Sequence, residues 1–375
     1  MERAAAIRAF LTSHREEIVN DTLTLVRAQS PTSDRAACEA CADAVEALLV
    51  KRLGASPVAV YPQERNGRHL YYIIGEGRRA GLLIGHYDTV WNIDALPLVA
   101  TENRIAGPGV YDMKYGIVAA VWSLLALREL GLLNRSYGLF FNSDEEIGSG
   151  SSRPIFEPVA REWDNVLVLE PATDGALKSG RKGVGAFDIT VHGVAAHAGN
   201  DYEKGRSAVL SAAKLIETLH GLTDLSRGTT VNVGIVSGGT KRNVVAAEAE
   251  LTVDFRVCTA AEGERIVHAI NALTPDTDGV RFDIRGGINR PPFEFTEANQ
   301  ALYSRIEEAG REMGIPVSHV FVGGGSDGNF TSAMGIPTLD GFGAVGTGAH
   351  ADYEHILIDE SIRHTGLLCA SLLQL

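Results

Sequence analysis

Cysteine is scarce in this sequence, with four residues in 375. So few thiols do not make a disulfide framework for a chain of this length. Cys38 and Cys41 form a CxxC pair, but they lie in an amphipathic helical pattern, and Cys258 and Cys369 are too isolated to complete a zinc ribbon. We therefore interpret Cys38 and Cys41 as buried helical thiols.

Long apolar runs are also lacking. No uninterrupted apolar stretch reaches the roughly 20 residues of a membrane span, so we expect no membrane as partner. The first residues, MERAAAIRAFLTSHREE, are charged throughout and contain no apolar core of a secretory signal. These features predict a cytoplasmic location.

Positive charge is in deficit, because 34 Lys and Arg face 47 Asp and Glu and leave a net charge of -13. This balance argues against nucleic acid or an anionic membrane surface as a partner. A composition of 45% hydrophobic and 22% charged residues is that of a soluble globular protein. The length favours two domains.

Helical and strand patterns alternate in the first half of the chain, which favours a mostly parallel sheet flanked by helices. The predicted helices are 4–29, 35–53 and 113–130, and the predicted strands are 57–61, 70–74, 82–85, 137–141 and 165–169.

The pattern changes after Lys178. Strands predicted at 184–191, 229–236, 249–257 and 280–284, with helices at 207–219 and 260–273, indicate a four-stranded antiparallel sheet covered by two helices. The α/β pattern resumes from Pro291, with a predicted helix at 296–313, a strand at 318–322 and a final helix at 359–373. We predict an α/β fold with a discontinuous domain of residues 1–177 and 288–375, interrupted by an α+β (ferredoxin-like) domain of residues 178–287.

Histidine and acidic residues follow several predicted strands, and the carboxyl ends of strands are where open α/β sheets place their sites. His86 and Asp88 follow the strand 82–85 and face the same side of an extended chain. Asp88 could therefore orient the His86 imidazole for a metal. Asp144, Glu145 and Glu146 follow the strand 137–141, and Glu170 follows the strand 165–169. The other candidates are Asp112, just before the helix 113–130, and His350 with Glu354, after a glycine-rich loop.

Three adjacent acids, Asp144 to Glu146, repel one another unless they face water or a positive charge lies opposite. For Asp112, helix N-capping is the alternative role. Two histidines and several carboxylates at one sheet edge suit a pair of divalent ions, which need about five ligands if a carboxylate bridges them. Nitrogen and oxygen donors without thiolate favour zinc, with manganese or cobalt as alternatives.

The ordered motifs resemble those of the M20 family of metallopeptidases, in particular its glutamate carboxypeptidases and related amidohydrolases. The matching motifs are His86-x-Asp88, Gly109-Val110-Tyr111-Asp112-Met113-Lys114, Asp144-Glu145-Glu146-x-Gly148-Ser149, Glu170-Pro171, His197-Ala198-Gly199 and His350-x3-Glu354. The resemblance runs from about residue 80 to the C-terminus. It implies a dinuclear zinc catalytic domain interrupted by a lid, or dimerisation, domain.

The resemblance also implies roles for individual residues. His86 and Glu170 would bind one ion, Glu146 and His350 the other, and Asp112 both. Asp88 would orient His86. A hydroxide bridging the metals would attack an amide carbonyl, with Glu145 as general base and then general acid. The implied substrate is a small peptide or N-acyl amino acid with a free carboxylate.

Positions of the inserted domain match substrate-contacting positions of relatives; they are Arg181, Lys182, His197 and Asn243. His197 would stabilise the tetrahedral oxyanion. His197 and Asn243 often reach the neighbouring subunit's site in this family, so the resemblance implies a homodimer formed through the lid domain.

Two departures from the family pattern bear on specificity. Tyr115 stands where relatives usually carry glycine, which predicts a reshaped site entrance. Phe321-Val322 stands where glutamate-cleaving relatives tend to carry an arginine, so Arg290, Arg181 or Lys182 would have to bind the substrate carboxylate. The released residue and the acyl group stay open, and a dipeptidase or an amidohydrolase of a non-peptide amide is the alternative.

Two other readings remain. Gly324-Gly325-Ser326-Asp327-Gly328 fits the G-x-S-x-G pattern, and Asp340 and His350 follow it in the order of a serine hydrolase. That reading lacks an oxyanion segment of HGGG type and leaves the upstream acids unexplained. A non-catalytic binding protein of the same fold should have lost its base or a ligand, whereas this chain keeps both.

Overall fold

The computed structural model describes residues 2–375, which divide into two compact units. The first unit comprises the chain up to Gly180, Phe295–Val322 and Ser326–Leu375, and the second comprises Arg181–Glu294 with Gly323–Gly325. The predicted inserted domain, 178–287, ends earlier than the second unit. The reason is strand β14 (Arg281–Arg290), which stays paired with β9 (Gly183–His192) well beyond residue 284.

The first unit is built around a six-stranded sheet in the order β1-β2-β6-β3-β7-β16. These strands are β1 (Ala59–Tyr61), β2 (His69–Ile74), β3 (Arg79–His86), β6 (Ser136–Asn142), β7 (Val166–Val168) and β16 (Thr338–Leu339). The pairs β6–β3, β3–β7 and β7–β16 are parallel, whereas β1–β2 and β2–β6, which lie toward the β1 side of the sheet, are antiparallel. The predicted mostly parallel sheet is confirmed.

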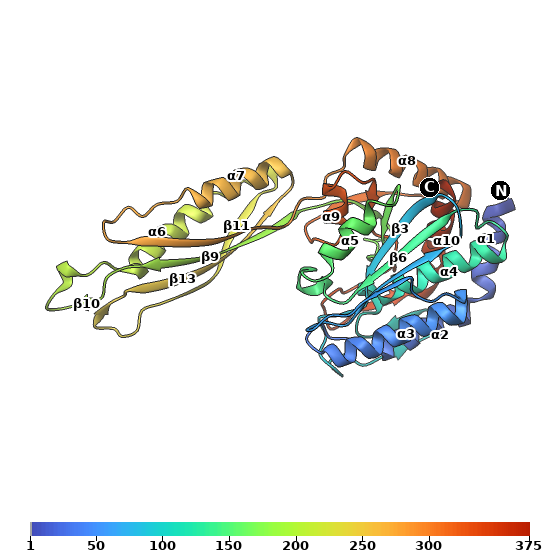
Figure 1. Ribbon diagram of the computed structural model, residues 1–375, viewed down its shortest axis with the longest axis horizontal. Helices are drawn as coiled ribbons and strands as arrows, with labels where there is room; N and C mark the ends of the chain where they lie inside the picture. The colour runs from blue at the N-terminus through green and yellow to red at the C-terminus, as the bar shows by residue number, and fades with distance from the viewer. Residues whose placement is uncertain (1) are drawn as a thin grey trace. The chain divides into compact units, whose positions relative to one another are not determined.

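Helices cover both faces of this sheet because its central strands are apolar on both sides. Leu139 and Phe141 of β6 pack in one core with α3, α4, α8 and α10, whereas Phe140 packs in a second core with α5 and α9. The helices of this unit are α1 (Glu2–Ser13), α2 (Arg15–Arg27), α3 (Arg35–Leu53), α4 (Tyr115–Glu129), α5 (Arg153–Ala160), α8 (Glu297–Met313), α9 (Gly328–Ala333) and α10 (Ile358–Gln374). Figure 1 shows α4 and α10 beside the strands β3 and β6.

The predicted helix 4–29 is two helices, α1 and α2, which are interrupted at His14. The hydroxyl of Ser13 donates to the Phe10 carbonyl oxygen, and His14 Nδ1 lies 2.8 Å from the same oxygen. Side chains that bond a nearby carbonyl compete with the helical ladder, which accounts for the break.

The segment Val110–Glu129 is long and apolar enough to cross a membrane by length and composition. Most of it is buried inside the first unit, as is usual for the core helix of a folded domain. Tyr115 lies in this core, where its hydroxyl is 2.9 Å from Thr365 Oγ1 of α10. The expectation that Tyr115 reshapes a site entrance is therefore wrong.

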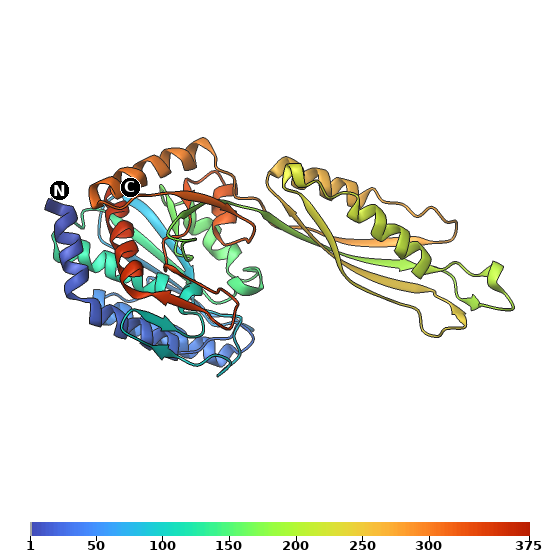
Figure 2. The same cartoon turned by 180° about the vertical axis from the view of Figure 1, so that it is seen from behind.

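The second unit contains a four-stranded antiparallel sheet in the order β11-β13-β9-β14, with β11 at Thr230–Gly238 and β13 at Glu248–Val257. Buried and less buried side chains alternate along β9 and β13, so one face is apolar. The helices α6 (Ala208–His220) and α7 (Ala260–Asn271) pack against that face, and Figure 2 shows both helices on the same side of the sheet. The smaller strands β10 (Ala196–His197) and β12 (Val244–Val245) form a separate pair.

The remaining strands of the first unit are short. A small sheet joins β17 (Gly346–Thr347), β18 (His355–Leu357), β5 (Arg104–Ala106) and β4 (Val99–Ala100), and another pair joins β15 (His319–Val322) to β8 (Leu177–Arg181). Because β18 pairs with β5, the loop that carries His350 and Glu354 is fastened to the segment that leads into Asp112.

Candidate metal centre

His86 ends the buried strand β3 at the carboxyl edge of the large sheet. Its Nδ1 lies 3.0 Å from the Asp88 carbonyl oxygen and 3.4 Å from Asp88 Oδ1. Both oxygens accept hydrogen bonds, so Nδ1 of the neutral ring carries the proton and Nε2 presents its lone pair. This is the tautomer that a metal-binding imidazole needs.

Asp112 lies between the two histidines. Its Oδ1 is 3.3 Å from His86 Nε2, and its Oδ2 is 3.4 Å from His350 Nε2. The two oxygens of one carboxylate thus face two different imidazoles, which is the arrangement expected of a ligand shared by two cations.

Two further carboxylates complete the cluster, one beside each histidine. Glu170 Oε1 lies 3.5 Å from His86 Nε2, and Glu146 Oε2 lies 3.1 Å from His350 Nε2. Candidate ligand atoms of His86, Glu145 and Glu170 lie within 4.8 Å of one another, and so do those of His86, Asp112 and Glu146. The structure therefore brings the five predicted ligands and Glu145 together from five separate segments of the chain.

Several atoms of this cluster are buried without a hydrogen bond among residues 2–375, namely His86 Nε2, Asp112 Oδ1 and Glu146 Oε1. Buried polar atoms without partners are rare in folded proteins and call for a specific cause such as an ion. Imidazole nitrogens and carboxylate oxygens are donors that suit zinc and related divalent cations. The residues present therefore fit a metal centre.

The electrostatics of the cluster favour positive charge. Burial lowers the pKa of His86, but the carboxylates of Asp112, Asp88 and Glu170 outweigh it and hold the pKa well above its usual range. Asp112 and Glu146 raise the pKa of His350 to about 10. Burial raises the pKa of Glu146 to about 7, even though His350 acts against that rise. A cluster that stabilises protons on two imidazoles provides the negative potential that a divalent cation requires.

Asp88 does more than orient His86. Its Oδ1 accepts the amide N–H of Glu145 (3.4 Å), and its Oδ2 accepts the amide of Glu146 (3.3 Å) and the hydroxyl of Thr32 (2.8 Å). One fully buried carboxylate thereby positions both a histidine of the cluster and the main chain of its acidic loop.

The three adjacent acids separate into different environments. Asp144 turns away from the cluster, and its Oδ2 accepts the amides of Ser151 (2.7 Å) and Ser152 (3.1 Å), which closes the loop after β6. Glu146 faces His350, and Glu145 lies beside His86 and Glu170. The repulsion expected among the three acids is thus relieved by giving each carboxylate a different partner.

Glu354 is a supporting residue whose function the sequence did not reveal, although its spacing from His350 was noted. It is buried, and its Oε1 accepts the amides of Tyr111 (2.9 Å) and Asp112 (3.1 Å). Its Oε2 accepts the Gly109 amide (3.2 Å) and the indole N–H of Trp91 (2.6 Å). Glu354 therefore fixes the backbone that presents Asp112.

Two predicted substrate residues of the second unit are neighbours. His197 pairs with Val244 across β10 and β12, and the amide of Ala198 donates to the Asn243 carbonyl oxygen (3.0 Å). His197 Nδ1 accepts the amides of Gly199 and Asn200. The Nε2 atom of the neutral, exposed ring therefore carries the proton and can donate a hydrogen bond.

The predicted cations of the second unit differ in exposure. Arg181 is buried and its guanidinium donates to the carbonyl oxygens of Gly324 and Gly325, both at 3.1 Å. Arg290 is buried at the end of β14, where it pairs with Val184, and Lys182 is half-buried. Their contacts with substrate, like those of His197 and Asn243, stay predictions.

Ser326 lacks the environment of a serine nucleophile. It is fully buried, and its hydroxyl donates to Asp340 Oδ2 (2.7 Å). His350, the base required by that hypothesis, instead lies against Asp112 and Glu146. The contacts do not support the serine hydrolase alternative.

Residues 82–374 match the model of peptidase family M20/M25/M40. The chain belongs to this family. Carboxypeptidase G2 of Pseudomonas sp. (strain RS-16) is 30% identical over 75% of this chain and 70% of its own length. Acetylornithine deacetylase of Myxococcus xanthus is 27% identical over 53% of this chain and 55% of its own length.

The fold is that of solved family structures. Aminopeptidase PepT of Bacillus cereus superposes with a TM-score of 0.81 over 96% of this chain and 98% of its own, at 22% identity. The family match and the curated relatives show that this M20 chain is a metal-dependent hydrolase of amide bonds.

Proposed function

We propose that this M20 chain hydrolyses a peptide or N-acyl amino acid with a free carboxylate, using two zinc ions. The observation that supports a pair of ions is the position of Asp112, whose two oxygens face His86 and His350. Glu170 would complete the set of the first ion and Glu146 that of the second. When bound, such ions lower the pKa of water and polarise a carbonyl group.

Glu145 is the proposed general base and acid. It lies within ligand distance of the cluster, while Asp88 holds its main-chain amide rather than its carboxylate. Glu145 would take a proton from the attacking water and deliver it to the leaving amine, so that the amide bond breaks without releasing an unstable amide anion. His197 Nε2–H would donate to the oxyanion of the tetrahedral intermediate.

The decisive variant is Glu145→Ala. We expect it to keep two metal ions per chain and to lose about 10²- to 10⁴-fold in kcat, because proton transfer is removed and the ligands remain. Metal content measured by plasma mass spectrometry and steady-state rates on a panel of N-acyl amino acids and dipeptides would check this. Glu76→Ala, which alters an exposed glutamate, is the matched control. Near-normal turnover of Glu145→Ala would remove Glu145 from the mechanism.

Metal removal tests the centre itself. We expect a chelator to abolish hydrolysis, and stepwise addition of zinc to restore it with two equivalents per chain. Manganese and cobalt additions would show which alternative ions support activity. Full recovery with one equivalent would contradict the dinuclear proposal, and activity that survives complete metal removal would contradict metal dependence.

A homodimer through the second unit is part of the proposal. Strand β11 lies at one edge of the antiparallel sheet, and its Ile235 and Val236 are exposed. Val209 and Leu210 at the start of α6 are exposed as well. An unpaired edge with apolar side chains is a surface that proteins normally cover.

The cytoplasmic location stays a prediction.

A further inference from the structure

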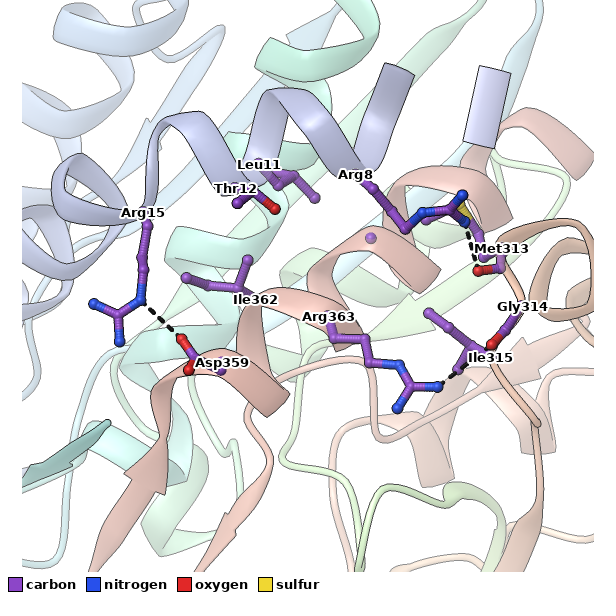
Figure 3. Close-up of a pocket in the computed structure, with 11 residues that line it drawn as sticks. Arg8, Leu11, Thr12, Arg15, Met313, Gly314, Ile315, Asp359, Ile362 and Arg363 are labelled. Atoms are coloured by element: carbon purple, nitrogen blue, oxygen red, sulfur yellow. Dashed lines mark hydrogen bonds and ion pairs between the residues drawn. The ribbon is translucent and has the colours of Figure 1, made fainter. Parts of the chain in front are cut away.

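The first unit contains a cavity that none of the metal-centre residues line. It has a volume of about 770 Å³ and lies between α1, the end of α8 and the first turns of α10 (Figure 3). Leu11, Ile315 and Ile362 supply apolar walls. The volume is in the range of small-molecule sites, which combine apolar walls with a few polar groups.

The charge of this cavity is opposite to that of the chain. Three arginines, Arg8, Arg15 and Arg363, and one carboxylate, Asp359, line it, which gives 3 − 1 = +2 in a chain of net charge -13. Arg15 is paired with Asp359 at 2.8 Å. The positive excess therefore lies with Arg8 and Arg363.

Arg8 and Arg363 bond backbone oxygens instead of carboxylates. Arg8 donates to the Met313 carbonyl oxygen (2.7 Å) and Arg363 to that of Gly314 (3.4 Å), and within residues 2–375 neither has a carboxylate within 4.0 Å. Helix capping at the end of α8 accounts for these two bonds. A guanidinium has five N–H donors, however, so one carbonyl bond each leaves donors for a ligand.

The side chains are arranged along the cavity. Figure 3 shows Arg8 and Arg363 extending toward Met313 and Gly314 at one side, and Arg15 with Asp359 at the other. Leu11 and Ile362 lie between the two sides in this view. The cavity thus has one cationic end, an apolar middle and one charge-balanced end.

We propose that this cavity binds an organic monocarboxylate with an unbranched apolar body, as in a medium-chain fatty acid. The carboxylate accepts hydrogen bonds from Arg8 and Arg363, and the apolar body covers Leu11, Ile315 and Ile362. A second anionic group on the ligand would find no unpaired cation among the described residues at the other end of the cavity, because Asp359 already neutralises Arg15. The site is separate from the metal centre and does not depend on the proposed reaction.

Calorimetric titration of the whole chain with decanoate, below its micellar concentration, tests the proposal. We expect one saturable site per chain that is retained after metal is removed with a chelator, and markedly weaker binding of decan-1-ol. Binding that disappears with the metal would assign decanoate to the metal centre and overturn the proposal. Equal binding of decan-1-ol would show that the arginines do not recognise the carboxylate, which also overturns it.

Variants locate the site. Arg363→Gln and Arg8→Gln each remove a charged donor at an exposed position and should weaken decanoate binding by about tenfold. Arg363→Lys should retain most of the affinity, and Thr12→Trp should block the cavity while all three arginines remain. Arg78→Gln is the matched control, because Arg78 is exposed, pairs with Asp164 and does not line the cavity. Wild-type affinity in Arg363→Gln or in Thr12→Trp overturns the proposal.

Discussion

Asp88 and Glu354 show how single carboxylates organise the centre through the main chain. Asp88 accepts the amides of Glu145 and Glu146, and Glu354 accepts those of Gly109, Tyr111 and Asp112. Hydrogen bonds from backbone N–H groups to a buried carboxylate are strong and directional. Two segments of the candidate metal centre are therefore each held by a residue from a distant part of the chain.

Replacing Glu354 tests this support. Glu354→Gln keeps one oxygen but places an NH₂ group against backbone donors, so the Asp112 segment should shift. We expect zinc affinity to fall by about 10- to 100-fold, as for other residues that orient ligands. Competition with a chromophoric chelator measures that affinity. Glu360→Gln alters a more exposed neighbour that bonds Asn103, and it should bind zinc like the wild type; equal losses in both variants would refute a specific role for Glu354.

Residue types at strand ends predicted that histidines and carboxylates would gather at one edge of the sheet, because parallel strands place their carboxyl ends together. The family resemblance, and not the strand ends, singled out the five ligands among them. The pattern could not assign Asp144, which bonds Ser151 and Ser152 and takes no part in the cluster. Nor could it reveal the bond from Trp91 to Glu354. Such contacts depend on loop conformations that have no periodicity in the sequence.

Helix α4 packs so closely against its neighbours at Gly116 that there is no room for a side chain. A Cβ atom there would clash with the carbonyl oxygen of Leu169, the residue before Glu170. The neighbouring Tyr115 points into the core towards α10. Gly116 lies one position after the place where relatives usually carry glycine. It lets α4 approach the end of β7, which leads into the proposed ligand Glu170.

Gly116→Ala should lower the free energy of unfolding by about 1 to 3 kcal/mol, because the added methyl group overpacks this contact. Urea denaturation followed by circular dichroism measures the change. Gly150→Ala is the control, since a Cβ atom at Gly150 meets no atom within 4 Å. If Gly116→Ala unfolds at the wild-type urea concentration, the close approach of α4 does not constrain residue 116.

Long periodic elements were predictable, as with α3, whose bounds Arg35–Leu53 match the prediction. Short strands such as β4 and β17 were missed, because two residues show no alternation. Strand β14 was predicted too short: Gly286 and Gly287 interrupt its apolar pattern, although the strand continues to Arg290. Glycine weakens the sequence signal of a strand without ending its pairing.

At the scale of the whole molecule, the change from mixed α/β to antiparallel pattern after Lys178 was enough to predict an inserted domain. The exact boundaries of this domain could not be predicted. They are marked by hydrogen bonds between the main chains of Arg181 and Phe293, and main-chain contacts leave no signal in the side-chain pattern.

The proposed dimer is tested on the exposed edge of the second unit. Ile235→Lys places a charge on β11 and should convert dimer to monomer, because an edge lysine opposes strand pairing. Analytical ultracentrifugation measures the mass. Val58→Lys, at an exposed valine of the first unit, should leave the mass unchanged. A wild-type chain that sediments as a monomer at all concentrations would refute the dimer.

The two ends of the inserted unit are hydrogen-bonded to each other, since the amide of Arg181 donates to Phe293 and the amide of Phe293 donates to Arg181, both at 3.0 Å. The segment Arg181–Glu294 therefore leaves and re-enters the first unit at almost the same point. A lineage could acquire, exchange or delete the whole insertion by repairing one short junction, and the strands that carry the proposed ligands would keep their order.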